Sequence, residues 1–170
     1  RIFDNNDDVQ LDGWQIDDIS ITENPAGTTP YPFVAGFDSE SDLIGNWVTT
    51  NRGREFVWTA NEGHTGSGAI YLYPPQNIQA GITGARMSHT LVMAKPIDLT
   101  GSVNPQLSFW HRYRTYDWYG GYYVYVSMDG GRNWINKGRW NRSNTPDGTQ
   151  SAWRREQVDL TPYANSKNVL

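Results

Sequence analysis

The chain has 170 residues, with 14 basic and 18 acidic side chains, a net charge of -4 and no cysteine. This length fits one domain with a buried core, and the lack of cysteine excludes both disulfide bonds and a cysteine nucleophile. The acidic balance, with a pI of about 5.2, argues against partners such as nucleic acid or anionic membranes. No apolar run approaches the ~20 residues of a membrane-spanning helix, so we expect no membrane insertion.

Good helix formers are scarce, with 9 Ala, 8 Leu, 5 Glu and 3 Lys, whereas turn formers are abundant, with 14 Asn, 13 Asp and 17 Gly. This composition favours short strands joined by many turns, and we predict an all-β fold. At most a helical turn is expected, within residues 39–45 or after Pro162. In chain order, strands are expected at residues 13–21, 31–36, 47–50, 56–60, 69–73, 87–93, 107–114, 122–128, 134–140 and 152–159.

The first of these strands changes its apolar side partway along. Trp14 and Ile16 share one phase of the alternation, whereas Ile19 and Ile21 share the other. A β-bulge between the two pairs would return all four side chains to one buried face and turn a neighbouring carboxylate inward. The sequence therefore predicts a bulge at residues 17–18.

Five runs of the sequence together resemble a known family of modules. They are residues 13–21 (GWQIDDISI), 97–101 (IDLTG), 107–113 (LSFWHRY), 126–134 (VSMDGGRNW) and 158–164 (VDLTPYA). Side by side, they are similar to the MAM-like jelly-roll modules that follow the catalytic domain in immune inhibitor A-type secreted metallopeptidases and occur in many bacterial extracellular proteins. The resemblance implies an antiparallel jelly-roll β-sandwich of the galactose-binding or MAM-like kind. It implies little about activity, because a fold does not fix a function.

The order of these runs departs from the family. There, the Trp-x-Ile-Asp-Asp-Ile run is the last strand, whereas here it stands near the N-terminus, and the chain ends at Leu170 where the preceding strand would begin. We therefore divide the chain into a closing-strand segment, residues 1–21, a linker, residues 22–32, and a sandwich body, residues 33–170. Three arrangements remain open: a repeat of a tandem array, a subunit that lends the segment to a neighbouring copy, and a circular permutant that closes on itself.

Calcium is the cofactor that the resemblance implies, in a structural site where the strand near residue 38 meets the 16–19 run. The candidate ligands are Asp17, Asp18, Asp38 and Glu40. Carboxylate oxygens are the ligands that Ca²⁺ prefers, and the predicted bulge would let one of the adjacent aspartates join the site.

Exposed aromatic side chains are the second group of candidates. Four candidates belong to an aromatic loop, in which one aspartate stands among the rings: Tyr116, Asp117, Trp118 and Tyr119. The other two, Trp140 and Trp153, are flanked by arginines and could form another surface. Three interpretations stay open: a platform for a glycan, packing in the core or under arginines, and contacts between modules.

Catalysis is not expected, because the three histidines are scattered and no metalloprotease or nucleophile-elbow motif is present. We predict instead a structural module of an extracellular or cell-surface protein, secreted and bacterial, whose partners are neighbouring copies. The alternative is a carbohydrate-binding or accessory module of a secreted hydrolase or metallopeptidase. Six apolar side chains of the closing segment would hold two copies together: Ile2, Phe3, Trp14, Ile16, Ile19 and Ile21.

Overall fold

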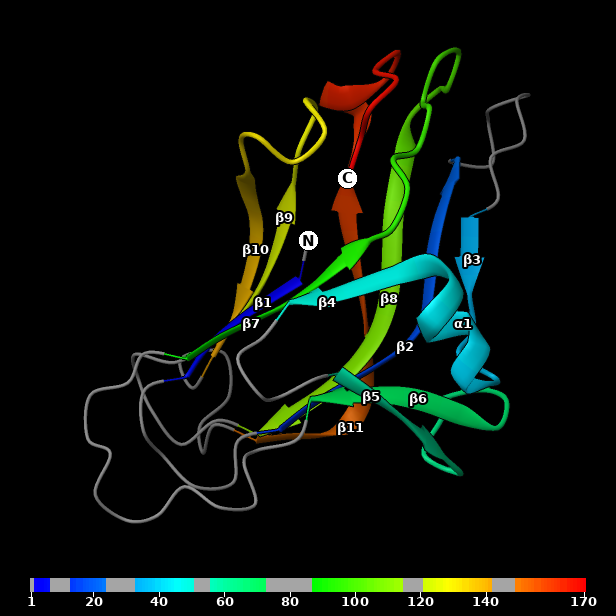
Figure 1. Ribbon diagram of the computed structural model, residues 1–170, viewed down its shortest axis with the longest axis vertical. Coiled ribbons are helices and arrows are strands. Elements are labelled where there is room, and N and C mark those ends of the chain that lie inside the picture. Colours follow the sequence, from blue (N-terminus) through cyan, green and yellow to red (C-terminus); the bar gives the residue numbers. More distant parts are fainter. Residues whose placement is uncertain are drawn as a thin grey trace.

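The computed structural model describes residues 2–6, 13–23, 33–50, 56–72, 87–114, 121–141 and 149–170. These residues form two antiparallel β-sheets packed as a sandwich, with one short α-helix beside them (Figure 1). The predicted all-β class is therefore confirmed. Within this part of the chain, no helix is long and apolar enough to cross a membrane.

The first sheet has five strands, and the strand nearest the N-terminus lies in its middle. Its order is β10 (Ile135–Trp140), β9 (Tyr122–Val126), β1 (Ile2–Asn6), β7 (Met87–Met93) and β4 (Trp47–Thr50). Strand β1 pairs with β7 on one side and β9 on the other. It lies outside the ten predicted strands, because its polar sequence IFDNN shows no clear alternation.

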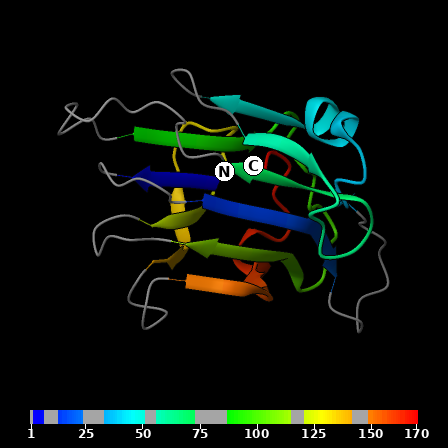
Figure 2. The same ribbon diagram turned by 90° about the horizontal axis from the view of Figure 1, so that it is seen from below.

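The second sheet has six strands, five of them in one continuous order, and β2 from the same N-terminal segment lies inside it. Its order is β11 (Thr149–Asp159), β8 (Pro105–Arg114), β2 (Gly13–Glu23), β6 (Gly68–Leu72) and β5 (Phe56–Ala60), with β3 (Phe33–Ala35) paired to β2. Figure 2 shows β2 running beside β8. In this structure the segment thus pairs with strands of its own chain.

The core fills the space between the two sheets. Strand β8 turns Phe109, His111 and Tyr113, which share one phase of its alternation, inward, and β9 turns Val124 and Val126 toward them. All these side chains are nearly or fully buried. The core thus joins β8 of one sheet to β9 of the other.

The predicted bulge in β2 is present. The pairing of β2 with β8 shifts between Asp17 and Ser20, and Asp18 adopts a φ of 49°. Helical structure lies near both expected places but is more extensive: α1 (Glu40–Asn46) is seven residues long, about two turns, and a short 3-10 helix, η2 (Thr161–Tyr163), includes Pro162. Asp42 of α1 accepts the N–H of Ser39 in a capping box.

Candidate functional site

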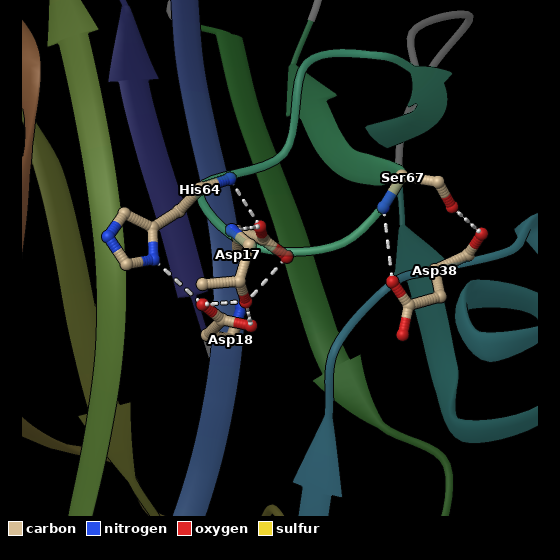
Figure 3. A network of polar contacts seen from close by, with 6 residues as sticks. Asp17, Asp18, Asp38, His64 and Ser67 are labelled. Atoms are coloured by element: carbon tan, nitrogen blue, oxygen red, sulfur yellow. Dashed lines mark hydrogen bonds and ion pairs between the residues drawn. The ribbon is translucent and has the colours of Figure 1, made fainter.

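A buried carboxylate on β2 holds the loop that connects β5 to β6, residues 61–67. Asp17 is fully buried, and its Oδ2 accepts hydrogen bonds from the backbone N–H groups of His64 and Thr65, at 2.6 and 3.3 Å (Figure 3). Its Oδ1 accepts the N–H of Asp18 at 2.9 Å. Three donors compensate the loss of water around this carboxylate, and they fix the path of the loop.

Asp18 contacts the same loop because of the bulge. Adjacent side chains of a regular strand point to opposite faces, and the left-handed backbone at Asp18 interrupts that alternation. The Asp18 Oδ2 atom lies 2.9 Å from His64 Nδ1, and both carboxylate oxygens accept the Thr65 hydroxyl at 2.7 Å. Two consecutive carboxylates thereby contact two consecutive loop residues.

A third carboxylate binds the far end of the loop. Asp38 Oδ1 accepts the backbone N–H of Ser67 at 3.2 Å, and the Asp38 carbonyl accepts the Ser67 hydroxyl at 2.7 Å (Figure 3). Gly66 has a φ of 70°, and a Cβ atom there would collide with Asp38 Oδ1. Only glycine therefore allows this contact. We call the three aspartates and the 61–67 loop the aspartate clamp.

Burial changes the acidity of the clamp. It raises the pKa of Asp17 from 3.8 to about 6, the hydrogen bond from the Asp18 N–H opposes the rise, and the negative charge of the Asp18 carboxylate adds to it. A nearby cation would relieve the repulsion between the two carboxylates.

The clamp meets some of the requirements of a calcium site. The carboxylates of Asp17, Asp18 and Asp38 all contact the 61–67 loop, and carboxylate oxygens are the ligands that Ca²⁺ prefers. Glu40, by contrast, lies in the exposed first turn of α1. Among the residues that the structure describes, no three His, Asp or Glu side chains form a group that could hold a metal ion. Asp17 Oδ2 and Asp38 Oδ1 instead accept hydrogen bonds from backbone N–H groups of the loop. Calcium binding stays a prediction.

Aromatic and charged side chains cover the outer face of β8 and β11 beside the clamp. The His64 ring stacks on Trp110 with 3.8 Å between ring centroids, and it meets the Trp153 ring edge-on at 5.9 Å. The Arg112 guanidinium lies 5.0 Å from the centroid of the Trp153 ring and forms an ion pair with Glu62. We call these five residues the Trp110–Trp153 surface.

The structure separates two tryptophans that the sequence suggested as one surface. Trp140 is 8% exposed and packs edge-on against Phe109 and His111, so it belongs to the core. Trp153, by contrast, is half-buried on the outer face. The predicted aromatic loop lies outside the described residues: Tyr116, Asp117, Trp118 and Tyr119.

The closing segment contributes to the core through β2. Ile16, Ile19 and Ile21 are at most 6% exposed. For Ile2, Phe3 and Trp14, the structure describes the backbone pairing: they lie opposite Val124, Tyr123 and Tyr113, respectively.

Sequence reasoning missed the partners of the two adjacent aspartates. The run Gly63-His64-Thr65-Gly66 predicts a turn, but it does not show which strand the turn will contact. Two glycines around a polar pair were the available signal, because glycine permits close approach of a backbone to another group.

Three comparisons with known proteins gave no match: no family model, no curated protein and no solved structure matches this chain. The structure itself defines the chain as an all-β sandwich in which the carboxylates of Asp17, buried, and Asp18, half-buried, hold the β5–β6 loop. The MAM-like resemblance and its jelly-roll topology stay predictions.

Proposed function

We propose that the chain is a non-catalytic structural module of an extracellular fibre or surface array, either a repeat or a subunit that exchanges its N-terminal strands with a neighbour. The observation that carries the proposal is the position of two N-terminal strands, since β1 is the middle strand of one sheet and β2 lies between β8 and β6 in the other. Without them, both sheets would be divided. The contacts are the same whether the segment comes from the same chain or from a neighbouring copy.

Burial on β2 gives this segment a substantial share of the fold's stability. Ile16, Ile19 and Ile21 are all buried, and a fully buried side chain of this size contributes about 1.5–3 kcal/mol. The ladder to β8 adds backbone hydrogen bonds along most of β2. A neighbour that accepted these strands would be held firmly.

A cysteine pair tests the exchange directly, because the chain has no cysteine of its own. Phe3 and Tyr123 lie opposite each other on β1 and β9. The double variant F3C/Y123C should give a ladder of disulfide-linked multimers on a non-reducing gel when it is oxidised at high concentration. The matched control, V57C/Y71C, joins opposite residues of the β5–β6 hairpin and should give monomers only. Closed monomers of the first variant at every concentration would contradict exchange between separate chains.

The second candidate function is a carbohydrate-binding or accessory module of a secreted hydrolase. The Trp110–Trp153 surface favours it, since two half-buried indole rings with an arginine beside them are a common platform for sugar rings and polar hydroxyls. Loss of glycan binding on substitution of Trp153 is the experiment that tests it.

A further inference from the structure

Strand β8 has irregular pairing on both of its sides at the same level. It lies between β11 and β2 in the six-stranded sheet (Figure 2). The ladder to β2 shifts just after Asp17, which is opposite Trp110. The ladder to β11 shifts just before Arg154, where residues 151–153 are opposite the single residue Arg112 of β8. Bulges turn side chains in new directions and are frequent beside functional sites.

Each of the two bulges supports an aromatic ring on the outer face of β8. Trp153 lies within the bulge of β11, and the Arg112 guanidinium is 5.0 Å from the centroid of its ring. The bulge of β2 lets Asp18 contact the Nδ1 atom of His64, and the His64 ring stacks on Trp110. Both indole rings are half-buried, so each keeps an exposed part. An indole ring offers a large, rigid apolar face, which suits the apolar face of a sugar ring.

The basic side chains around this surface differ in whether a carboxylate balances their charge. Arg112 forms an ion pair with Glu62, and Arg154 forms one with Glu156 at 2.8 Å. Arg155 is exposed and forms no ion pair with any residue that the structure describes. The surface therefore carries a cation whose charge is available to an anionic ligand.

Arg155 lies on the same face of the sheet as Trp110. The two residues are opposite each other on antiparallel strands, so their side chains project to the same side. Arg155 Nη2 lies 3.4 Å from the hydroxyl of Ser108, which is only 5% exposed, so the guanidinium lies along the sheet. Ser108 precedes Trp110 by two residues, which is about 7 Å along a strand. A guanidinium has five N–H donors and binds a carboxylate or sulfate with two of them, so enough donors remain for a ligand.

We propose that the Trp110–Trp153 surface, together with Arg155, binds an acidic oligosaccharide. A sugar ring stacks on the indole rings, and the carboxylate or sulfate of the same or the next sugar pairs with the Arg155 guanidinium. This inference rests on the second candidate function and names the class of glycan. The outer face of β8 favours a sugar over a protein partner, because Gln106, Ser108 and Arg112 flank its indole with polar groups, whereas the core of a protein interface is apolar.

A glycan array with matched pairs tests the acidic class. The pairs are oligogalacturonates and their methyl esters, sialylated and unsialylated oligosaccharides, and sulfated and desulfated galactans. The chain should bind the acidic member of at least one pair at least about tenfold more tightly than the neutral member, because charge-assisted hydrogen bonds are about twice as strong as neutral ones. The pair that shows the preference identifies the anionic group.

Substitutions of two neighbouring arginines test the binding residue. Arg155→Gln should remove the preference for the acidic member and leave binding of the neutral member unchanged, whereas Arg155→Lys keeps the charge and should retain part of the preference. Arg154→Gln is the matched control and should keep the full preference, because Arg154 is already paired with Glu156. Both arginines are exposed, so thermal melts of the variants should match the wild type within a few degrees. A preference that Arg155→Gln leaves intact would overturn the role of Arg155.

The array also separates the failure of this inference from the failure of the function on which it rests. Equal binding of acidic and neutral members would overturn the acidic class and retain glycan binding. Binding to no member of the array would overturn both the second candidate function and the acidic class.

Discussion

The Asp17 carboxylate accepts a 2.6 Å hydrogen bond from the backbone N–H of His64, which lies 47 residues further along the chain. This contact joins a strand in the middle of one sheet to a loop at its edge. Because Asp17 is buried and Asp18 is charged beside it, the clamp is strained electrostatically whenever Asp17 is ionised. The dependence of the free energy of unfolding on pH is therefore the simplest probe of the clamp.

The clamp predicts a pH-dependent contribution to stability. The folded chain holds the pKa of Asp17 at about 6, above its value of 3.8 in the unfolded chain, so between these values the folded state binds more protons. The contribution of Asp17 is fully present below pH 3.8 and is lost as the pH rises through 6. Relative to Asp17→Asn, the wild-type free energy of unfolding should rise by up to about 1.4 kcal/mol per pH unit as the pH falls from 6 to 4.

Urea denaturation of both proteins at several pH values measures this difference. Burial lowers the pKa of His111, which has the opposite effect on stability, since protonation of the unfolded chain is favoured below pH 6.5. His111 is present in both proteins, so its effect cancels in the difference. A difference that does not change with pH would show that Asp17 keeps its ordinary pKa.

The core face of β2 predicts a large loss of stability on truncation. Ile16 is fully buried, and Ile16→Ala should lower the free energy of unfolding by about 3–4 kcal/mol through lost burial and a new cavity. Val34 on the neighbouring β3 is 62% exposed, and Val34→Ala is the matched control, with a change within about 0.5 kcal/mol. Thermal and urea melts of the two variants make the comparison. Similar losses would mean that β2 does not hold the sheets together as described.

Local pattern predicted much of this fold. The change of phase between Ile16 and Ile19 predicted the bulge, because it depends on neighbours in sequence. The alternation around Phe109 places aromatic rings on both faces of β8, so it does not tell which face is buried. The contact of His64 with Asp18 depends on residues 46 apart, and no local pattern contains it. Nor does composition tell that Trp140 packs in the core whereas Trp153 lies half-buried outside, since both stand among arginines.

Calcium binding predicts a rise in Tm of the wild-type chain on addition of Ca²⁺ and its reversal by EDTA. The physical reason is the repulsion between the Asp17 and Asp18 carboxylates, which a bound cation would offset. Asp38→Asn should reduce the rise, and Asp98→Asn, at an exposed carboxylate that binds the N–H of Thr100, is the matched control. An equal Tm in Ca²⁺ and in excess EDTA would show that no calcium ion stabilises the folded chain.

Glycan binding, the second candidate function, predicts that a substitution on the outer face of the six-stranded sheet abolishes the binding of sugars. Trp153→Ala should abolish binding on a glycan array and leave the melt within a few degrees, because its ring is half-buried and packs against surface groups rather than the core. Trp118→Ala and Tyr119→Ala test the aromatic loop in the same assay, and Ile44→Ala, at a side chain 72% exposed on α1, is the control. Binding that survives Trp153→Ala but not Trp118→Ala would assign the sugar to the aromatic loop. Absence of binding by the wild-type chain across the array would leave the Trp110–Trp153 surface as a packing or module contact, where the Arg112–Glu62 ion pair holds the indole ring in place.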